Sequence, residues 1–127
     1  MIKVSISLDM IETAKKRAST LPNSKSAFMD YERHVVGFLG EEIFKKTFPT
    51  AVTSKDIDVY DYDFMLYTKK IEIKTKMVTS VPKPHYECSI YTYFNQDPDF
   101  YFFCRVIKKE DTYPYGWLLG YIDTKTF

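Results

Sequence analysis

Residues 63–74 read DFMLYTKKIEIK, and this stretch decides the fold. Its charged and apolar residues alternate, a pattern that predicts a β-hairpin with one apolar and one wet face. The turn falls at Thr68-Lys69 or at Lys69-Lys70, although neither pair is a strong turn of the Asn-Gly type. The face that can pack into a core carries Phe64, Leu66, Ile71 and Ile73.

The other face of this hairpin is charged. With the turn at Thr68-Lys69, Asp63 pairs with Lys74, and Glu72 shares their face because side chains alternate along a strand. Two carboxylates beside a lysine suit a magnesium-dependent phosphodiesterase, since the acids hold the hard cation through oxygen. The lysine can orient a water or offset charge on the scissile phosphate. A half-buried strand with a solvated face is the plainer interpretation.

A long helix is predicted from residue 26 to residue 48, where Pro49 ends it. Its glycines, in the segment GFLGEEIF at 37–44, each cost about 1 kcal/mol relative to alanine. They are tolerable if a neighbouring strand or a phosphate must approach the backbone closely. Glu41 and Glu42 follow the second glycine, and either is a site residue or a solvated surface charge. The apolar stripe of this helix carries Val35, Val36, Leu39 and Ile43.

Helix and hairpin together resemble the PD-(D/E)XK nuclease superfamily. Restriction endonucleases, Holliday junction resolvases and some phage and homing endonucleases belong to it. The resemblance rests on Gly-x-x-Gly-Glu-x-x-Phe, then an acid, then Ile-Glu-Ile-Lys, and it covers residues 35–76. Residues 98–106 and 116–122 look like the closing strands of small phage-type members.

The chain departs from the family pattern at two points. Tyr62 stands where the family has a proline. Asp61 also lies on the same face as Asp63 by parity, so either acid fits the pattern.

The resemblance implies an α/β (α+β) fold of the restriction endonuclease-like kind, with a mixed central β-sheet flanked by helices. By carry-over, Asp63 and Glu72 ligate Mg²⁺, for which Mn²⁺ substitutes, and the backbone carbonyl of Ile73 is a third ligand. Lys74 positions the attacking water, and Glu41 completes the shell of the metal. The basic residues expected to bind DNA are Lys69, Lys70 and Lys76, and a second basic group is Lys15, Lys16 and Arg17. Simple solubility is the alternative explanation for both groups.

The implied activity is hydrolysis of phosphodiester bonds in double-stranded or branched DNA, leaving a 5′-phosphate. Because one chain offers one active site, cutting both strands favours a homodimer. The alternative is a non-catalytic DNA-binding or interaction module that retains the fold. The sequence leaves the biological role and the target open.

Composition indicates one domain over residues 1–127, with 45% hydrophobic residues and a net charge of +1. This charge does not mark a strongly basic DNA-binding protein. No apolar run approaches the roughly 20 residues of a membrane span. Without a signal-peptide pattern, we expect a location in the cytoplasm, or in the host cytoplasm for a phage-encoded chain. Cys88 and Cys104 are not spaced as a metal or redox pair, so we expect buried thiols.

The remaining elements follow from local patterns. A strand is expected over residues 2–8, and Asp9-x-x-Glu12 is interpreted as a capping box that opens a helix ending near Ser19. The inward positions of that helix are Ile11, Ala14 and Ala18. Further strands are expected through Ile57 and Val59, over residues 86–94, over the strongly apolar central segment 100–107, and over 117–122.

Overall fold

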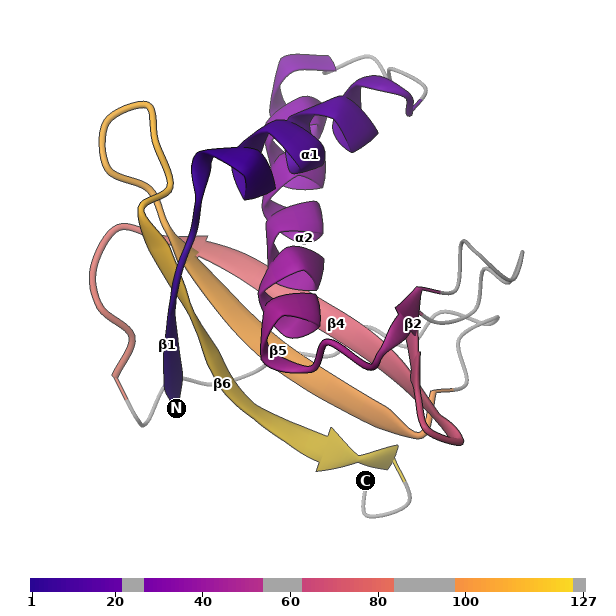
Figure 1. Ribbon diagram of the computed structural model, residues 1–127. Helices are drawn as coiled ribbons and strands as arrows, with labels where there is room; N and C mark the ends of the chain where they lie inside the picture. Colours follow the sequence, from indigo (N-terminus) through magenta and orange to yellow (C-terminus); the bar gives the residue numbers. More distant parts are fainter. Residues whose placement is uncertain (22–26, 54–62, 84–97, 125–127) are drawn as a thin grey trace.

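The computed structural model describes residues 1–21, 27–53, 63–83 and 98–124, and within them two helices lie on one side of a mixed sheet (Figure 1). The helices are α1 (Leu8–Ser19) and α2 (Ala27–Thr47). The strands are β1 (Ile2–Ser5), β2 (Val52–Thr53), β3 (Phe64–Leu66), β4 (Lys69–Val78), β5 (Phe100–Ile107) and β6 (Tyr115–Asp123). The expected combination of helices with a mixed sheet is confirmed.

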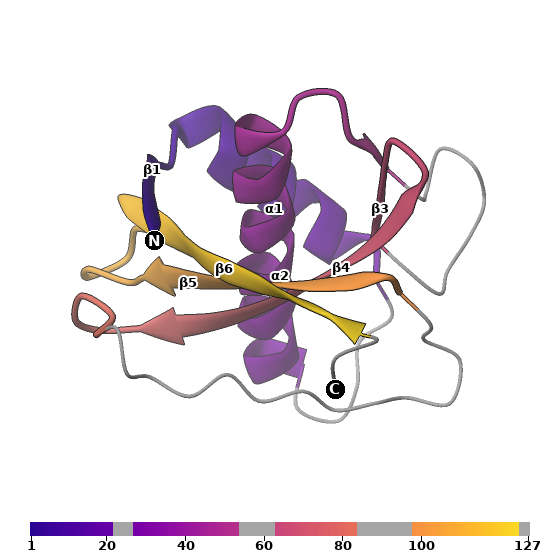
Figure 2. The same cartoon turned by 90° about the horizontal axis from the view of Figure 1, so that it is seen from below.

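The six strands lie in the order β1-β6-β5-β4-β3-β2. β4 and β5 run parallel, and every other neighbouring pair is antiparallel. The long strands β4, β5 and β6 form the middle of the sheet (Figure 2). Seven of the eight residues of β5 are buried, so this strand is covered on both faces, which is typical of near-continuous apolar strands. The central strand expected over 100–107 is confirmed.

The turn of the β3–β4 hairpin lies at Tyr67-Thr68, because Leu66 pairs with Lys69. The expected turns at Thr68-Lys69 and Lys69-Lys70 are therefore wrong. Without an Asn-Gly pair to fix the turn, the packing of Phe64 and its partner Ile71 in the core determines the register. The observed register differs by two residues from the one expected with the turn at Thr68-Lys69. Because side chains alternate with a period of two, every side chain keeps its expected face.

Tyr67 accommodates this turn with a φ of 54°, in the left-handed region that the primed hairpin turns use. Tyr67 is 84% exposed, so burial of its side chain does not offset the strain of this conformation.

Helix α2 lies across the sheet and packs on β4, β5 and β6. The expected apolar stripe is buried, and Phe44 adds the largest side chain of this layer. The ring of Phe44 lies 5.0 Å from the rings of Phe64 and Phe102, which joins the hairpin to the central strand. The helix ends at Thr47, as Pro49 predicts.

Gly40 allows α2 to approach β4 closely. A Cβ atom at this position would lie 1.8 Å from Oγ1 of Thr75, a distance that only glycine avoids. The Cys104 thiol also donates to the Gly40 carbonyl at 3.8 Å. A Cβ atom at Gly37 would meet nothing within 4 Å. The close approach of a neighbouring strand therefore explains the second glycine of the helix and leaves the first unexplained.

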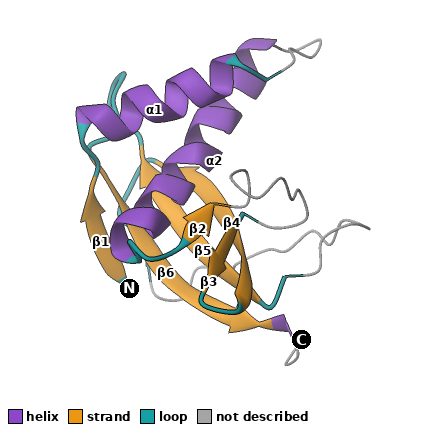
Figure 3. Cartoon of the chain, turned by 45° about the vertical axis from the view of Figure 1, so that its right-hand side comes forward, coloured by secondary structure: helices purple, strands orange, loops and turns teal. Residues whose placement is uncertain are grey.

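Helix α1 begins after Ser7, whose Oγ accepts a hydrogen bond of 3.2 Å from the backbone N–H of Met10. The capping box expected to begin at Asp9 is therefore wrong, because the cap lies two residues earlier, at Ser7. Asp9 lies in the first turn of the helix, where the helix dipole favours an acid. The preceding strand ends at Ser5 because Ser7 already belongs to the cap. The inward positions Ile11, Ala14 and Ala18 are buried as expected. Figure 3 shows α1 crossing α2.

Some expectations fall outside the described residues, namely the strands through Ile57 and Val59 and over 86–94, and the burial of Cys88. Cys104 is buried as expected, and burial raises the pKa of its thiol to about 12, which makes it unreactive. Neither described helix is long and apolar enough to cross a membrane.

Candidate functional site

The structure holds Asp63 firmly against β4. Its backbone N–H donates to the carbonyl of Ile71 at 2.9 Å, and its Oδ2 accepts a hydrogen bond of 2.8 Å from the N–H of Ile73. Asp63 thus continues the pairing of β3 with β4 by one residue. This register places it opposite Glu72, and not opposite Lys74 as the sequence had indicated.

The carboxyl groups of Asp63 and Glu72 share a hydrogen bond in which Asp63 is the acceptor. Nζ of Lys74 lies 3.8 Å from Oε1 of Glu72. Ile71 and Ile73 belong to the core beneath α2, so Glu72 and Lys74 project from the other face, as alternation predicts. Glu72 is nevertheless only 7% exposed, which makes it a buried acid and not a solvated one.

Helix α2 brings a third carboxyl group to this pair. The charges of Glu41 and Asp63 repel each other, and the charge of Glu41 also acts on Glu72. Glu42 is half-buried, and its charge acts on Glu41. Of the two candidate glutamates, Glu41 is therefore the one that the fold turns towards the hairpin acids. Glu41, Asp63, Glu72 and Lys74 are called the acidic site below.

Burial dominates the electrostatics of the acidic site. It raises the pKa of Glu41 to about 8, with the charge of Asp63 as the second cause. It raises the pKa of Glu72 to about 9, again with Asp63 as the next cause. Burial also raises the pKa of Asp63, against the hydrogen bond from Ile73. Crowded and desolvated carboxyl groups of this kind hold protons at neutral pH unless a cation replaces them.

The donor set of the acidic site suits a hard divalent cation only in part. Among the described residues, no group of three or more His, Cys, Asp and Glu side chains is placed to hold an ion. Mg²⁺, however, is usually bound by one or two carboxylates, with waters and substrate phosphates completing its shell. The hydrogen-bonded pair Asp63 and Glu72 meets that requirement. Ile73, the third expected ligand, lies beside them in β4.

The lysines expected to bind DNA do not form one patch. Alternation along β4 places Lys70 and Lys76 on the face of Glu72 and Lys74. Lys69 lies on the opposite face, at the rim of an apolar hollow. Lys76 and Lys69 are exposed, whereas Lys70 is partly buried.

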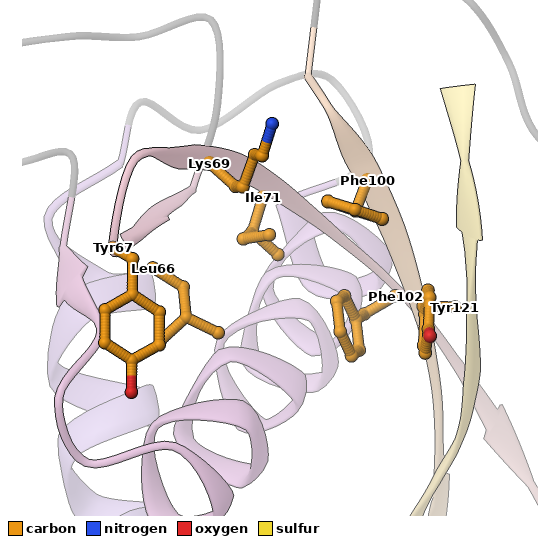
Figure 4. Close-up of a pocket in the computed structure, with 7 residues that line it drawn as sticks. All are labelled: Leu66, Tyr67, Lys69, Ile71, Phe100, Phe102 and Tyr121. Atoms are coloured by element: carbon orange, nitrogen blue, oxygen red, sulfur yellow. The ribbon is translucent and has the colours of Figure 1, made fainter. Parts of the chain in front are cut away.

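The hollow is a cavity of about 210 Å³ under the hairpin turn, shown in Figure 4. Its aromatic side consists of Phe100, Phe102 and Tyr121, in which the rings of Phe102 and Tyr121 stack at 5.2 Å. The hairpin contributes Leu66, Tyr67, Lys69 and Ile71. None of these seven described residues is an acid, and none belongs to the acidic site.

Arg17 of α1 reaches this region too, although the sequence predicted no contact between it and the acids. Its Nη2 donates to Oε1 of Glu41 at 3.1 Å. In the sequence it belongs to a basic group on α1 that is also explained by solubility. A weak signal was present, because Ala14 and Ala18 are buried and Arg17 borders the face that they define.

Asp61, the other candidate acid, lies outside the described residues, so the contacts above concern Asp63 alone. No protein-family model, curated protein or solved structure matches this chain. The acidic site is therefore the feature of this chain from which a function can be inferred.

Proposed function

We propose that this chain is a metal-dependent DNA endonuclease with a PD-(D/E)XK site on a restriction endonuclease-like fold. The observation that supports it most is the hydrogen bond between the carboxyl groups of Asp63 and Glu72, with Lys74 Nζ 3.8 Å from Glu72. Burying two acids in contact costs stability unless a proton or a cation neutralises them. A solvated strand face would not bury Glu72 to this extent.

The proposed metal is Mg²⁺, with Mn²⁺ as a substitute. Asp63, Glu72 and the backbone carbonyl of Ile73 would hold it, and the ion would stabilise negative charge on the scissile phosphate. The hydrogen bond from the Ile73 N–H fixes the orientation of Asp63 before any ligand arrives. Pre-oriented ligands of this kind reduce the reorganisation that binding and reaction require.

The protein side chains have separate roles in this proposal. Lys74 orients the attacking water and offsets the charge that develops on the phosphate. Glu41 is the third carboxyl group, and it reaches the site from α2. Lys70 and Lys76 lie on the same face as Lys74, where they can contact neighbouring phosphates. A role for Lys69 requires DNA that extends to the hairpin turn.

The proposed substrate is double-stranded or branched DNA, which is cut to leave a 5′-phosphate. Because each chain would supply one acidic site, cleavage of both strands would use a homodimer.

The deciding experiment incubates the protein with supercoiled plasmid, a linear duplex and a branched junction, each with Mg²⁺ or with EDTA. We expect nicking or cleavage with Mg²⁺, its loss in EDTA, and its return with excess Mg²⁺. A Glu72→Gln protein purified in parallel controls for contaminating nucleases. Undiminished cleavage in EDTA would contradict the proposal, and DNA binding without cleavage would identify the non-catalytic alternative.

A further inference from the structure

The hollow under the hairpin turn combines an aromatic wall with a single cation. Of the seven described residues that line it, six are aromatic or apolar, and Lys69 at the rim is the charged one. Figure 4 shows Tyr67 on the hairpin side, with Phe102 and Tyr121 across the hollow from it. Phe102 pairs with Tyr121 between β5 and β6, so the sheet fixes this wall. Tyr121 is nevertheless 62% exposed, which leaves part of the wall open to a ligand.

The volume of the hollow limits what can occupy it. At about 210 Å³ it is smaller than the ~300–1,000 Å³ pockets that hold cofactors and drug-sized ligands. It is larger than the ~150 Å³ cavity in which an engineered apolar core binds one benzene molecule. The hollow therefore admits one planar ring system. Lys69 at its rim favours a ring that carries a negative charge nearby.

Tyr67 has a conformation that its own chain does not explain. Its φ of 54° lies in a region that glycine and asparagine adopt far more readily than tyrosine does. The side chain is 84% exposed, so packing within the chain does not compensate for the strain. Strained residues cluster at binding sites, where a ligand gives them a role. The strain at Tyr67 and the cavity beside it are independent observations, and both indicate a ligand in contact with this ring.

We propose that the hollow binds one unpaired nucleotide of a DNA strand, with its base against Tyr67 and Tyr121 and its phosphate at Lys69. The inference rests on the proposed function, since it takes DNA as the substrate. Aromatic side chains beside a cation hold unpaired bases in many proteins, because every base offers a flat π face and every nucleotide a phosphate. A nucleotide thus matches both the planar interior of the hollow and the charge at its rim.

The position of the hollow requires the nucleotide to be unpaired. Ile71 lines the hollow, whereas Glu72, the next residue of β4, projects from the other face of the sheet. A strand that runs from the acidic site to the hollow must therefore bend round the hairpin turn. A duplex resists so sharp a bend, because its persistence length is about 50 nm. The hollow accordingly selects branched or frayed DNA over a plain duplex.

The experiment measures DNA binding in EDTA by fluorescence anisotropy, so that no metal contributes and no DNA is cut. Three labelled DNAs share one duplex, which is blunt, carries an overhang of unpaired thymidines, or carries an overhang of as many abasic residues. The abasic overhang keeps the phosphates and lacks only the bases. We expect the parent chain to bind the thymidine overhang about tenfold more tightly than the abasic one. Tyr67→Gly and Tyr121→Leu should reduce this ratio towards one, whereas the matched control Tyr67→Phe should keep it.

Thermal melts separate the loss of a ligand contact from a loss of folding. Tyr67→Gly should hold or raise Tm, because glycine adopts this φ without strain, and should still lose the preference for bases. A residue that served only the fold would show the opposite pattern. On the blunt duplex these variants and Lys69→Ala should bind like the parent, since paired DNA contacts the other face of β4.

Equal affinity of the parent for the thymidine and abasic overhangs, in a protein that nicks plasmid with Mg²⁺, would overturn the inference alone. A folded Tyr67→Gly variant with the base preference of the parent would do the same. Free thymidine monophosphate that competes as well as an unlabelled thymidine overhang would identify a free nucleotide as the ligand and contradict the inference. A parent chain that neither binds nor nicks DNA would overturn the proposed function and the inference with it.

Discussion

Asp63 and Glu72 share a hydrogen bond between their carboxyl groups at the point where β3 meets β4. Two acids in contact bind one proton between them, because both cannot be charged at low cost. The metal-free acidic site therefore binds a proton, and the same acids are the proposed metal ligands. Variants of these acids should separate proton binding from metal binding.

Glu72→Gln should abolish Mg²⁺-dependent cleavage, because an amide lacks the charge that holds the ion. The free energy of unfolding of the metal-free protein should hold or rise, since an amide N–H can donate to Asp63 as the protonated acid does. Plasmid nicking and denaturant unfolding in EDTA measure the two effects. A variant that unfolds readily in EDTA would contradict a protonated Glu72 in the metal-free fold, and retained cleavage would contradict its role as a metal ligand.

Asp63→Asn and Asp61→Asn test which acid serves the site. We expect loss of cleavage for Asp63→Asn and near-parent cleavage for Asp61→Asn. The reverse result would identify Asp61, two residues away on the same face, as the metal ligand. The nuclease proposal would still hold.

The stability of the metal-free protein should fall as pH rises from about 5 to about 9. Glu41 and Glu72 have folded-state pKa values of about 8 and about 9, above the ordinary 4.5. Between these limits the folded protein keeps protons that the unfolded chain has released. Stability is therefore lost as pH rises towards the folded pKa values.

Thermal melts in EDTA across this range, repeated with the Glu41→Gln/Glu72→Gln double variant, measure the effect. The double variant should show a flatter dependence on pH. A parent protein that becomes more stable towards pH 9 would be incompatible with buried, proton-holding glutamates at these positions.

Sequence alternation was sufficient to assign the faces of the hairpin, because a shift of two residues in register preserves parity. It was insufficient for the turn itself, since no residue near Thr68 enforces one turn type. The cap of the first helix was likewise predicted at the wrong residue, at Asp9 instead of Ser7. The Oγ of Ser7 accepts the N–H of Met10, and the backbone N–H of the preceding Ile6 is already paired with the carbonyl of Pro114.

Arg17 was beyond sequence reasoning for a different reason. Its partner Glu41 is 24 residues away on another helix, and the contact exists only once α1 has packed across α2. The approach of Gly40 to Thr75 is also tertiary, although an unexplained glycine in a helix did signal that something comes close.

Lysines on the two faces of β4 should differ in their effects. Lys74→Ala should lower kcat severely while leaving Mn²⁺ binding measurable, because its charge acts on the transition state. Lys76→Ala should weaken DNA binding and reduce its salt dependence by about one phosphate contact. Lys69→Ala should have little effect, since this side chain lies on the opposite face beside the apolar hollow. Titrations of duplex DNA at several salt concentrations distinguish the three variants. If Lys69→Ala had the largest effect, the duplex would contact the face of β4 opposite to the one we propose.

Gly40→Ala and Gly37→Ala form a matched pair within one helix. A Cβ atom at Gly40 would collide with Thr75, so α2 must move away from β4 or the side chain of Thr75 must rotate. We expect a loss of about 1–3 kcal/mol in the free energy of unfolding, as for other overpacked sites. Gly37→Ala meets open space and should gain up to about 1 kcal/mol from helix propensity.

Urea unfolding of both variants in EDTA gives the two values without interference from a bound metal. Because Gly40 directly precedes Glu41, the shift of α2 should also reduce Mn²⁺ affinity in Gly40→Ala and leave it unchanged in Gly37→Ala. Equal stabilities for the two variants would show that α2 and β4 are further apart than the structure places them. The position of Glu41 relative to Asp63 and Glu72 would then need revision.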